Sequence, residues 1–398
     1  MQTTAGSSFL RAEVDLAQEE ARKRKAEKTK TLGSPIEVPG KPLAITIQGS
    51  GAWTAESNAI ARLIDLESGK TRKIFKGHSG PVTSLVLHDN GRILITGSWD
   101  QTIRVWNTQT KEVISSTAAH TDFVKGLFII PSLNLLVSGS SDKTVRFWDL
   151  SDVRSAQPLV STGSISAHTR PVERFAGYAT SDTTGVLYTA DTMGIIKAWN
   201  LEKEEGTPIR WRATVRTEFK HHRTGVNDMV FGADQLWTAS SDETVQVQHV
   251  VPPKETKPIP PITHPVAVKA ILHLGLTELA EPYLITGAGD VIRVYDVSSP
   301  EEPELLNVID AHWHDVTALR LWVRKTVGED GVTRVEPWVV SASLDGTLRK
   351  WRVSELLKPA PVQAEAVPST KEEPTNAEKP SGLTEEEERE LEELMAED

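Results

Sequence analysis

A unit of about twelve residues recurs along this chain, and it constrains the fold more than any other feature of the sequence. Its clear copies align with one another without gaps. Each copy alternates apolar and polar residues, passes through a polar turn, and alternates again up to a Trp, which is the pattern of a β-hairpin. The four clear copies span residues 95–106, 137–148, 188–199 and 340–351. Repetition at this scale indicates that each copy is one structural unit of a repeat architecture.

Three weaker copies fill the remaining chain. Residues 53–64 end in Ile, residues 237–248 end in Gln, and residues 285–295 are one residue shorter and end in Tyr. The ends of consecutive copies lie 42 to 56 residues apart. A four-stranded unit needs about 40–45 residues, so the later units are predicted to carry loop insertions, among them a loop at Val323–Pro337.

A His four residues before a Val precedes six of the hairpins, beginning with His78 and Val82. The first of these is a Gly-His pair at Gly77, and the third hairpin ends in Trp148-Asp149. With these signatures the sequence resembles the WD-repeat family over about residues 36–355. The resemblance implies an all-β, seven-bladed WD-repeat β-propeller, with an N-terminal helix and a disordered acidic C-terminal tail.

Three segments are predicted on this basis: an N-terminal helical extension at 1–32, the propeller at 33–358, and a linker with a short acidic helix at 359–398. The helix is expected from Ser8 to about Thr29, where apolar residues fall at helical spacing. It either lies solvated on the propeller or binds a partner. The last unit lacks an outer strand, so Ile36–Val38 is expected to pair with it and close the ring.

The net charge of −11 belongs almost entirely to the C-terminal tail. Residues 359–380 are rich in Pro, Ala, Glu and Thr, which predicts a disordered linker. Leu383–Met395 follows as a short acidic helix, which either folds on a partner or serves as a solubilising tail. The rest of the chain is nearly neutral, so direct nucleic-acid binding is not expected.

Composition excludes several classes of function. The chain has no Cys, which rules out disulfides, thiolate catalysis and cysteine-ligated zinc. No apolar run approaches the roughly 18 residues of a membrane helix, and no cofactor or metal is expected. The protein is placed in the cytosol or the nucleus, and the basic run Arg22–Lys25 leaves a nuclear signal open. The oligomeric state is not predicted.

A His, a hydroxyl residue, an Asp and a Trp recur together in three units. The predicted sets are His78, Thr96, Asp100, Trp106; His120, Ser138, Asp142, Trp148; and His312, Ser341, Asp345, Trp351. A hydrolase needs one such set with an exposed nucleophile, whereas three copies in the same register indicate a structural polar network in each blade. Other units are expected to have broken sets, because Met193 replaces Asp, Gln248 replaces Trp, and the first unit lacks the His.

The WD-repeat resemblance also implies a binding face at the His and Asp turns. Three positions in each unit are expected there: the residue before the Val, the residue after it, and the residue before the turn Asp. They are Trp99, Phe123, Lys125, Glu173, Asn227, Lys269, Asp315, Thr317 and Leu344. Trp99 and Phe123 are the expected anchors, since aromatic residues dominate interface energetics.

The leading prediction is therefore a scaffold or adaptor subunit of an intracellular complex that binds other proteins or peptides and is not an enzyme. A chromatin or histone reader is the first alternative. An enzyme built on a propeller is the second, and an acid–base cluster in the central channel that does not follow the repeat would be its mark.

Overall fold

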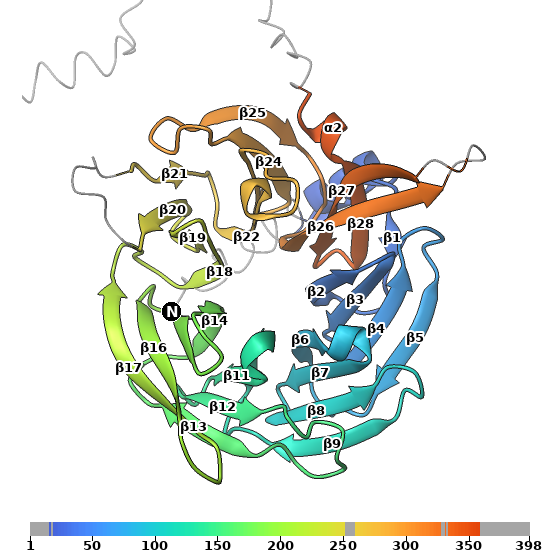
Figure 1. The fold of residues 1–398 in the computed structure, drawn as a ribbon. Helices are drawn as coiled ribbons and strands as arrows, with labels where there is room; N and C mark the ends of the chain where they lie inside the picture. The colour runs from blue at the N-terminus through green and yellow to red at the C-terminus, as the bar shows by residue number, and fades with distance from the viewer. Residues whose placement is uncertain (1–15, 17–18, 251–258, 328–330, 332, 359–398) are drawn as a thin grey trace, which may run out of the picture. The chain divides into compact units, whose positions relative to one another are not determined.

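Seven four-stranded antiparallel sheets surround a central opening (Figure 1). The computed structural model describes residues 16, 19–250, 259–327, 331 and 333–358. The seven-bladed propeller expected from the repeat is confirmed. The acidic tail, the linker before it and most of the expected first turns of the N-terminal helix lie outside the described residues.

Within each of the first six blades the strands follow the chain from the central opening outward. The strands of blades 1 to 3 are β2 (Pro42–Gln48), β3 (Gly51–Glu56), β4 (Ile60–Asp65), β5 (Thr71–Lys76); β6 (Val82–His88), β7 (Ile93–Ser98), β8 (Thr102–Asn107), β9 (Val113–Ala118); and β10 (Val124–Ile130), β11 (Leu135–Ser140), β12 (Val145–Asp149), β13 (Ser161–Ile165). Each predicted hairpin forms the second and third strands of its blade.

The later blades have the same order with longer strands at some positions. Those of blades 4 to 6 are β14 (Val172–Ala179), β15 (Thr184–Asp191), β16 (Ile196–Glu204), β17 (Arg210–Phe219); β18 (Val226–Gly232), β19 (Gln235–Ser240), β20 (Thr244–His249), β21 (Ile262–Thr263); and β22 (Val268–His273), β23 (Tyr283–Ala288), β24 (Val291–Asp296), β25 (Glu304–Ile309). Short 3-10 turns follow the first strand of blades 2, 3 and 6 as η1 (Asp89–Gly91), η2 (Pro131–Leu133) and η3 (Leu274–Leu276).

Blade 7 joins the two ends of the propeller. It consists of β26 (Val316–Val327), β27 (Thr333–Ser343), β28 (Thr347–Arg352) and β1 (Ile36–Glu37), and the short helix α2 (Val353–Leu356) follows β28. Ile36 pairs with Leu348 and Glu37 with Thr347. The predicted closure is confirmed, and it covers the strand edge that β28 would otherwise leave exposed.

The hydrophobic core lies between neighbouring blades, because each sheet buries both of its faces. One cluster combines Trp53 and Phe75 of blade 1 with Val82 and Trp106 of blade 2. Others combine blade 3 with blade 4 and blade 6 with blade 7 in the same way. Blade-to-blade packing therefore fixes where each turn lies on the ring.

A β-bulge recurs at the start of the first strand in all seven blades. In blade 2, Val82 pairs with Ser98 and Ser84 with Gly97, so the ladder skips Thr83. The skipped residues are Leu43, Thr83, Lys125, Glu173, Asn227, Lys269 and Thr317. A bulge changes the direction of the side chain at the extra residue. The second residue of each first strand therefore does not follow the alternation of side chains along the rest of that strand.

The N-terminal helix is helical at residues 19–29 in the described part, and its end is attached to the propeller. Lys25 Nζ lies 2.6 Å from carboxylate oxygens of both Asp290 and Asp310. The buried Arg349 donates to the carbonyls of Thr29 and Leu32, which belong to the last turn of the helix and the residues after it. This end of the helix is thus part of the propeller's surface.

The prediction of a loop at Val323–Pro337 is wrong. The β26–β27 ladder runs without interruption from Leu319 and Ser341 to Val327 and Thr333, so most of the insertion continues the hairpin (Figure 1). Val323, Thr326 and Val327 are β-branched residues, which are favoured in strands, and the prediction of a loop did not take them into account.

Candidate functional site

The polar set of blade 3 forms one chain of hydrogen bonds. The indole N–H of Trp148 donates to Ser138 Oγ over 2.8 Å, Ser138 Oγ lies 2.8 Å from His120 Nε2, and His120 Nδ1 lies 2.9 Å from the Asp142 carboxylate. A neutral imidazole protonated on Nδ1 satisfies every atom of this chain. Burial lowers the pKa of His120, which agrees with the neutral form.

The Asp at the end of this chain stays ionised. Burial by itself raises the pKa of Asp142, but hydrogen bonds from the hydroxyl and amide of Thr144 and from His120 lower it to about 2. The carboxylate thereby fixes the turn between β11 and β12 against the loop that carries His120. The network ties an outer loop to an inner hairpin.

Blades 2 and 7 repeat this geometry with their own residues. His78 bridges Asp100 and Thr96 at 2.8 Å on both sides, and His312 bridges Asp345 at 2.7 Å and Ser341 at 2.8 Å. Trp106 and Trp351 donate to the respective hydroxyls. Thr96, Ser138 and Ser341 have no exposed surface. A hydroxyl without solvent access is not placed to attack a substrate.

One of the expected broken sets is complete, and in another a second His contacts the hydroxyl that the missing Trp would reach. In blade 4, Asp191 lies 3.0 Å from His168 Nδ1. It therefore supplies the carboxylate that the repeat pattern placed at position 193, where the chain has Met. In blade 5, where Gln248 replaces the Trp, His221 Nε2 lies 3.1 Å from Thr238 Oγ, which also contacts His222. The aligned repeat positions did not reveal either contact. Asp191 lies two residues before the expected Asp position, and His221 lies next to the expected His222.

Blade 1 and blade 6 depart from the pattern. Blade 1 has a buried ion pair, in which Arg62 donates to both carboxylate oxygens of Glu56 at 2.7 and 3.1 Å. In blade 6, His264 contacts Thr286 Oγ at 2.9 Å, while the turn residue Asp290 binds Lys25 of the N-terminal helix instead.

Five of the seven bulged residues, Leu43, Thr83, Glu173, Asn227 and Thr317, line the central opening. Three of them clasp the next blade: Thr83, Asn227 and Thr317 each donate to the carbonyl of the residue that begins the following blade's first strand, at 2.6 to 2.8 Å. Lys125 and Glu173 instead form an ion pair of 3.5 Å between blades 3 and 4. Asn227 and Thr317, expected on the binding face, are thus engaged in holding blades together.

The two aromatic residues expected as anchors lie together. Trp99 and Phe123 stack with ring centroids 4.9 Å apart and planes 14° apart. The Lys125 ammonium lies 5.5 Å from the Trp99 ring centroid. Trp99 is 40% exposed and Phe123 is 38% exposed, so this pair is an apolar surface that the packing of blades 2 and 3 leaves open to solvent. We call Trp99, Phe123, Lys125 and Glu173 the aromatic cluster.

The remaining residues of the expected face lie elsewhere on the ring. Leu344 donates its amide to the Asp315 carbonyl at 3.0 Å, which joins two turns of blade 7. Lys269 is half-buried on β22 of blade 6. The nine predicted residues are therefore divided between the aromatic cluster, two hydrogen bonds between blades, one position on blade 6 and one pair of turns on blade 7.

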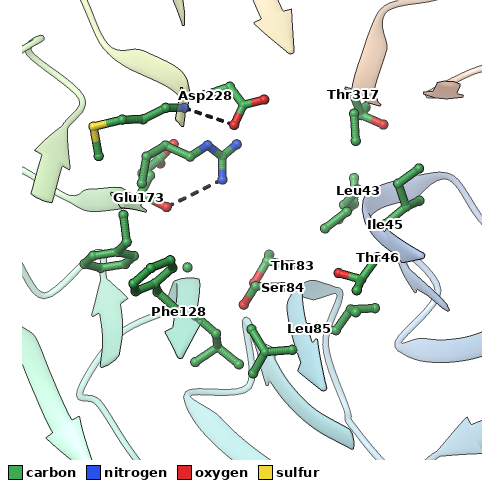
Figure 2. Close-up of a pocket in the computed structure, with 18 of the residues that line it drawn as sticks. Leu43, Ile45, Thr46, Thr83, Ser84, Leu85, Phe128, Glu173, Asp228 and Thr317 are labelled. Atoms are coloured by element: carbon green, nitrogen blue, oxygen red, sulfur yellow. Dashed lines mark hydrogen bonds between the residues drawn. The ribbon is translucent and has the colours of Figure 1, made fainter. Parts of the chain in front are cut away.

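A cavity of about 290 Å³ occupies the central opening. Figure 2 shows Leu43, Thr83, Glu173, Asp228 and Thr317 around it, all from the innermost strands. Arg174 and Arg320 also line it. Sequence reasoning did not single out either arginine, because the repeat gives no sign of which residues face the opening below the bulge.

The described residues offer neither a membrane-spanning helix nor a metal site. Among the described residues, no helix is both long and apolar enough to cross a bilayer. Over the same residues, no group of three His, Cys, Asp or Glu side chains is arranged to hold a metal ion.

Known proteins resemble this chain in sequence and in fold. A family model described as WD domain, G-beta repeat matches residues 69–107 and 111–149. The ribosome biogenesis protein YTM1 of Vanderwaltozyma polyspora is 33% identical over 139 residues, which is 34% of this chain and 27% of that protein. The crystal structure of the computationally designed Ika8 protein has a TM-score of 0.55 at 21% identity over 78% of this chain and 83% of that chain, a likeness of fold alone.

One relative covers nearly the whole chain. An uncharacterized WD repeat-containing protein of Schizosaccharomyces pombe is 30% identical over 371 residues, which is 88% of this chain and 90% of that protein. Together with the seven blades and the polar networks that join their turns, this similarity shows that the chain belongs to the WD-repeat β-propeller family.

Proposed function

We propose that this protein is an interaction scaffold or adaptor subunit of an intracellular complex, in the cytoplasm or the nucleus, and that a protein partner binds at the aromatic cluster. The observation that carries the proposal is the stacked, half-exposed pair of Trp99 and Phe123. Contiguous apolar surface often marks an interaction site, and aromatic side chains are common anchors of protein interfaces.

The surroundings of the pair support binding rather than packing. Both rings are carried by turns at the junction of blades 2 and 3, and backbone hydrogen bonds fix them: the Trp99 amide donates to the Pro81 carbonyl and the Ser141 amide to the Phe123 carbonyl, each at 3.0 Å. A rigid aromatic surface loses little conformational freedom when a partner covers it. Two partial relatives are named ribosome biogenesis protein YTM1 and THO complex subunit 6 of Arabidopsis thaliana, and the second name in particular fits a subunit of a larger complex.

The test is affinity purification with mass spectrometry on the parent and on a Trp99→Ala/Phe123→Ala double variant. Loss of a hot-spot pair costs more than about 2 kcal/mol, or roughly thirtyfold in affinity, so partners held by the cluster should disappear from the eluate. The matched control is Val215→Ala/Leu305→Ala, which removes exposed apolar side chains from the outermost strands β17 and β25.

Thermal unfolding of both variants must match the parent before the eluates are compared. If the folded double variant retains every partner of the parent, the aromatic cluster is not the binding site.

A further inference from the structure

The central cavity contains two guanidinium groups that bond only to main-chain carbonyls. Arg174 donates to the carbonyls of Asn227 and Glu173, and Arg320 donates to the carbonyl of Leu319 at 2.8 Å. Over the part of the chain that the structure describes, no Asp or Glu carboxylate lies within ion-pair distance of either group. An Arg has five N–H donors, so each side chain keeps donors for a ligand in the cavity.

The acidic groups beside them are already engaged. Glu173 pairs with Lys125 at 3.5 Å. Asp228 accepts from the amides of Met229 and Ile271, both at 3.0 Å, and thereby joins β18 to β22. Figure 2 shows Glu173 and Asp228 at the wall of the cavity. Both carboxylates therefore have partners, whereas the two guanidinium groups keep free donors. Among the described residues the buried Ser84 hydroxyl on the same wall also lacks a hydrogen-bond partner, and it can donate to a ligand as well.

We propose that this cavity takes an Asp or Glu side chain of a peptide partner, while an apolar residue beside it packs on the aromatic cluster. The inference rests on the proposed function and specifies the partner as an acidic peptide. Arg binds carboxylates through paired, charge-assisted hydrogen bonds, and these strengthen where water is excluded. At about 290 Å³ the cavity admits a side chain but not a folded domain.

A random peptide library displayed on phage, selected on the immobilised full-length protein, tests the chemistry without a known partner. Selected peptides should be enriched in Asp and Glu next to an apolar residue. Replacing the acidic residue by its amide in a synthetic copy should weaken binding at least about tenfold in fluorescence anisotropy. Selection of basic or neutral peptides, or of none, would overturn the proposal.

Variants of the two arginines measure the contribution of the cavity to peptide binding separately from that of the aromatic cluster. Arg320→Gln should weaken the selected peptide at least about tenfold, and its hydrogen bond to its own strand makes it the safer of the two changes for folding. Arg174→Gln should act in the same direction, with a thermal melt to exclude loss of its tie to blade 5. The matched control is Arg212→Gln, which changes an exposed Arg on β17 and should leave binding unchanged.

The two proposals fail in different ways. If Trp99→Ala/Phe123→Ala abolishes binding and both Arg variants bind like the parent, the interface stands and the acidic pocket is wrong. If the Arg variants lose the peptide and the aromatic variant keeps it, the cavity binds acidic peptides but the aromatic cluster is not the anchor. If inositol hexakisphosphate displaces the peptide and binds more tightly than it does, the cavity is a site for small anions and the peptide proposal is overturned.

Discussion

Blade 1 and blade 3 hold the hairpin of their second and third strands with different polar groups. Blade 3 links its loop to its hairpin through His120, Ser138 and Asp142. Blade 1 has no such His, and there Glu56 and Arg62 form a bidentate ion pair between adjacent strands, with Thr54 donating to the same carboxylate at 2.9 Å. In the repeat, Thr54 occupies the position of Ser138 and Arg62 that of Arg146.

The difference shows what the repeat requires of each blade. The polar groups at this hairpin are buried, so each must find a partner within the blade. A neutral His between a hydroxyl and a carboxylate meets that need, and so does a charged pair with no His at all. The charged pair makes blade 1 more sensitive to the loss of one partner, because removing either residue leaves an uncompensated buried charge.

Arg62→Met should have the largest effect on stability. Glu56 has no exposed surface. Without Arg62, the Thr54 hydroxyl is the one hydrogen-bond partner that its carboxylate keeps among the described residues. We expect a loss of about 3–5 kcal/mol in the free energy of unfolding, measured by chemical denaturation. Glu56→Leu/Arg62→Met should recover most of the loss, because two apolar residues leave no buried charge. A single variant as stable as the parent would show that blade 1 does not depend on the pair.

His120→Ala should have a smaller effect, about 1–3 kcal/mol, since it leaves the neutral Ser138 and the Asp142 carboxylate each short of one hydrogen bond. Asp142 keeps the bonds from Thr144, which limits the loss. Val160→Ala, a change at an exposed side chain, is the control and should stay within about 0.5 kcal/mol of the parent. A larger loss for His120→Ala than for Arg62→Met would reverse the ranking of the two blades.

Acid should destabilise the His-bearing blades. Burial lowers the pKa of His264 and His273 to about 4, and burial with the neighbouring His222 lowers that of His221 to about 4. Between about pH 6.5 and pH 4 the unfolded chain binds protons that the folded chain does not, so stability falls as pH falls through this range.

The smallest expected effect is that of one His on this acid response. His273→Met should reduce the drop in melting temperature between pH 6.5 and pH 4.5, because it removes one group whose pKa differs between the folded and unfolded states. His273 Nδ1 has no hydrogen-bond partner in the described part of the chain. Its ring packs against Trp237 with centroids 4.7 Å apart, so the melting temperature of the variant is compared with its own value at pH 6.5. Differential scanning fluorimetry across that range measures the effect. An unchanged pH slope in the variant would exclude His273 as a contributor.

Sequence patterns predicted what depends on local repetition. The alternation and the spacing of the seven hairpins predicted the blades, and the missing outer strand of the last unit predicted the pairing of Ile36 with blade 7. The aromatic residues at positions 99 and 123 stood out because blade packing does not call for them. These signals lie within a few residues of one another, so a single sequence displays them.

Other features depended on contacts between residues far apart in the chain. Only the folded ring shows that Asp191 completes the set of blade 4 and that His221 contacts the hydroxyl of the set in blade 5. The same holds for the ion pair of Asp290 with Lys25 and for the Glu56–Arg62 pair that stands in place of a His. The bulge that turns Lys125 toward Glu173 and the meeting of Arg174 and Arg320 at one cavity were decided in the same way. Local periodicity selects the strand and its face, but which polar groups meet is determined by the packing of seven sheets around one opening.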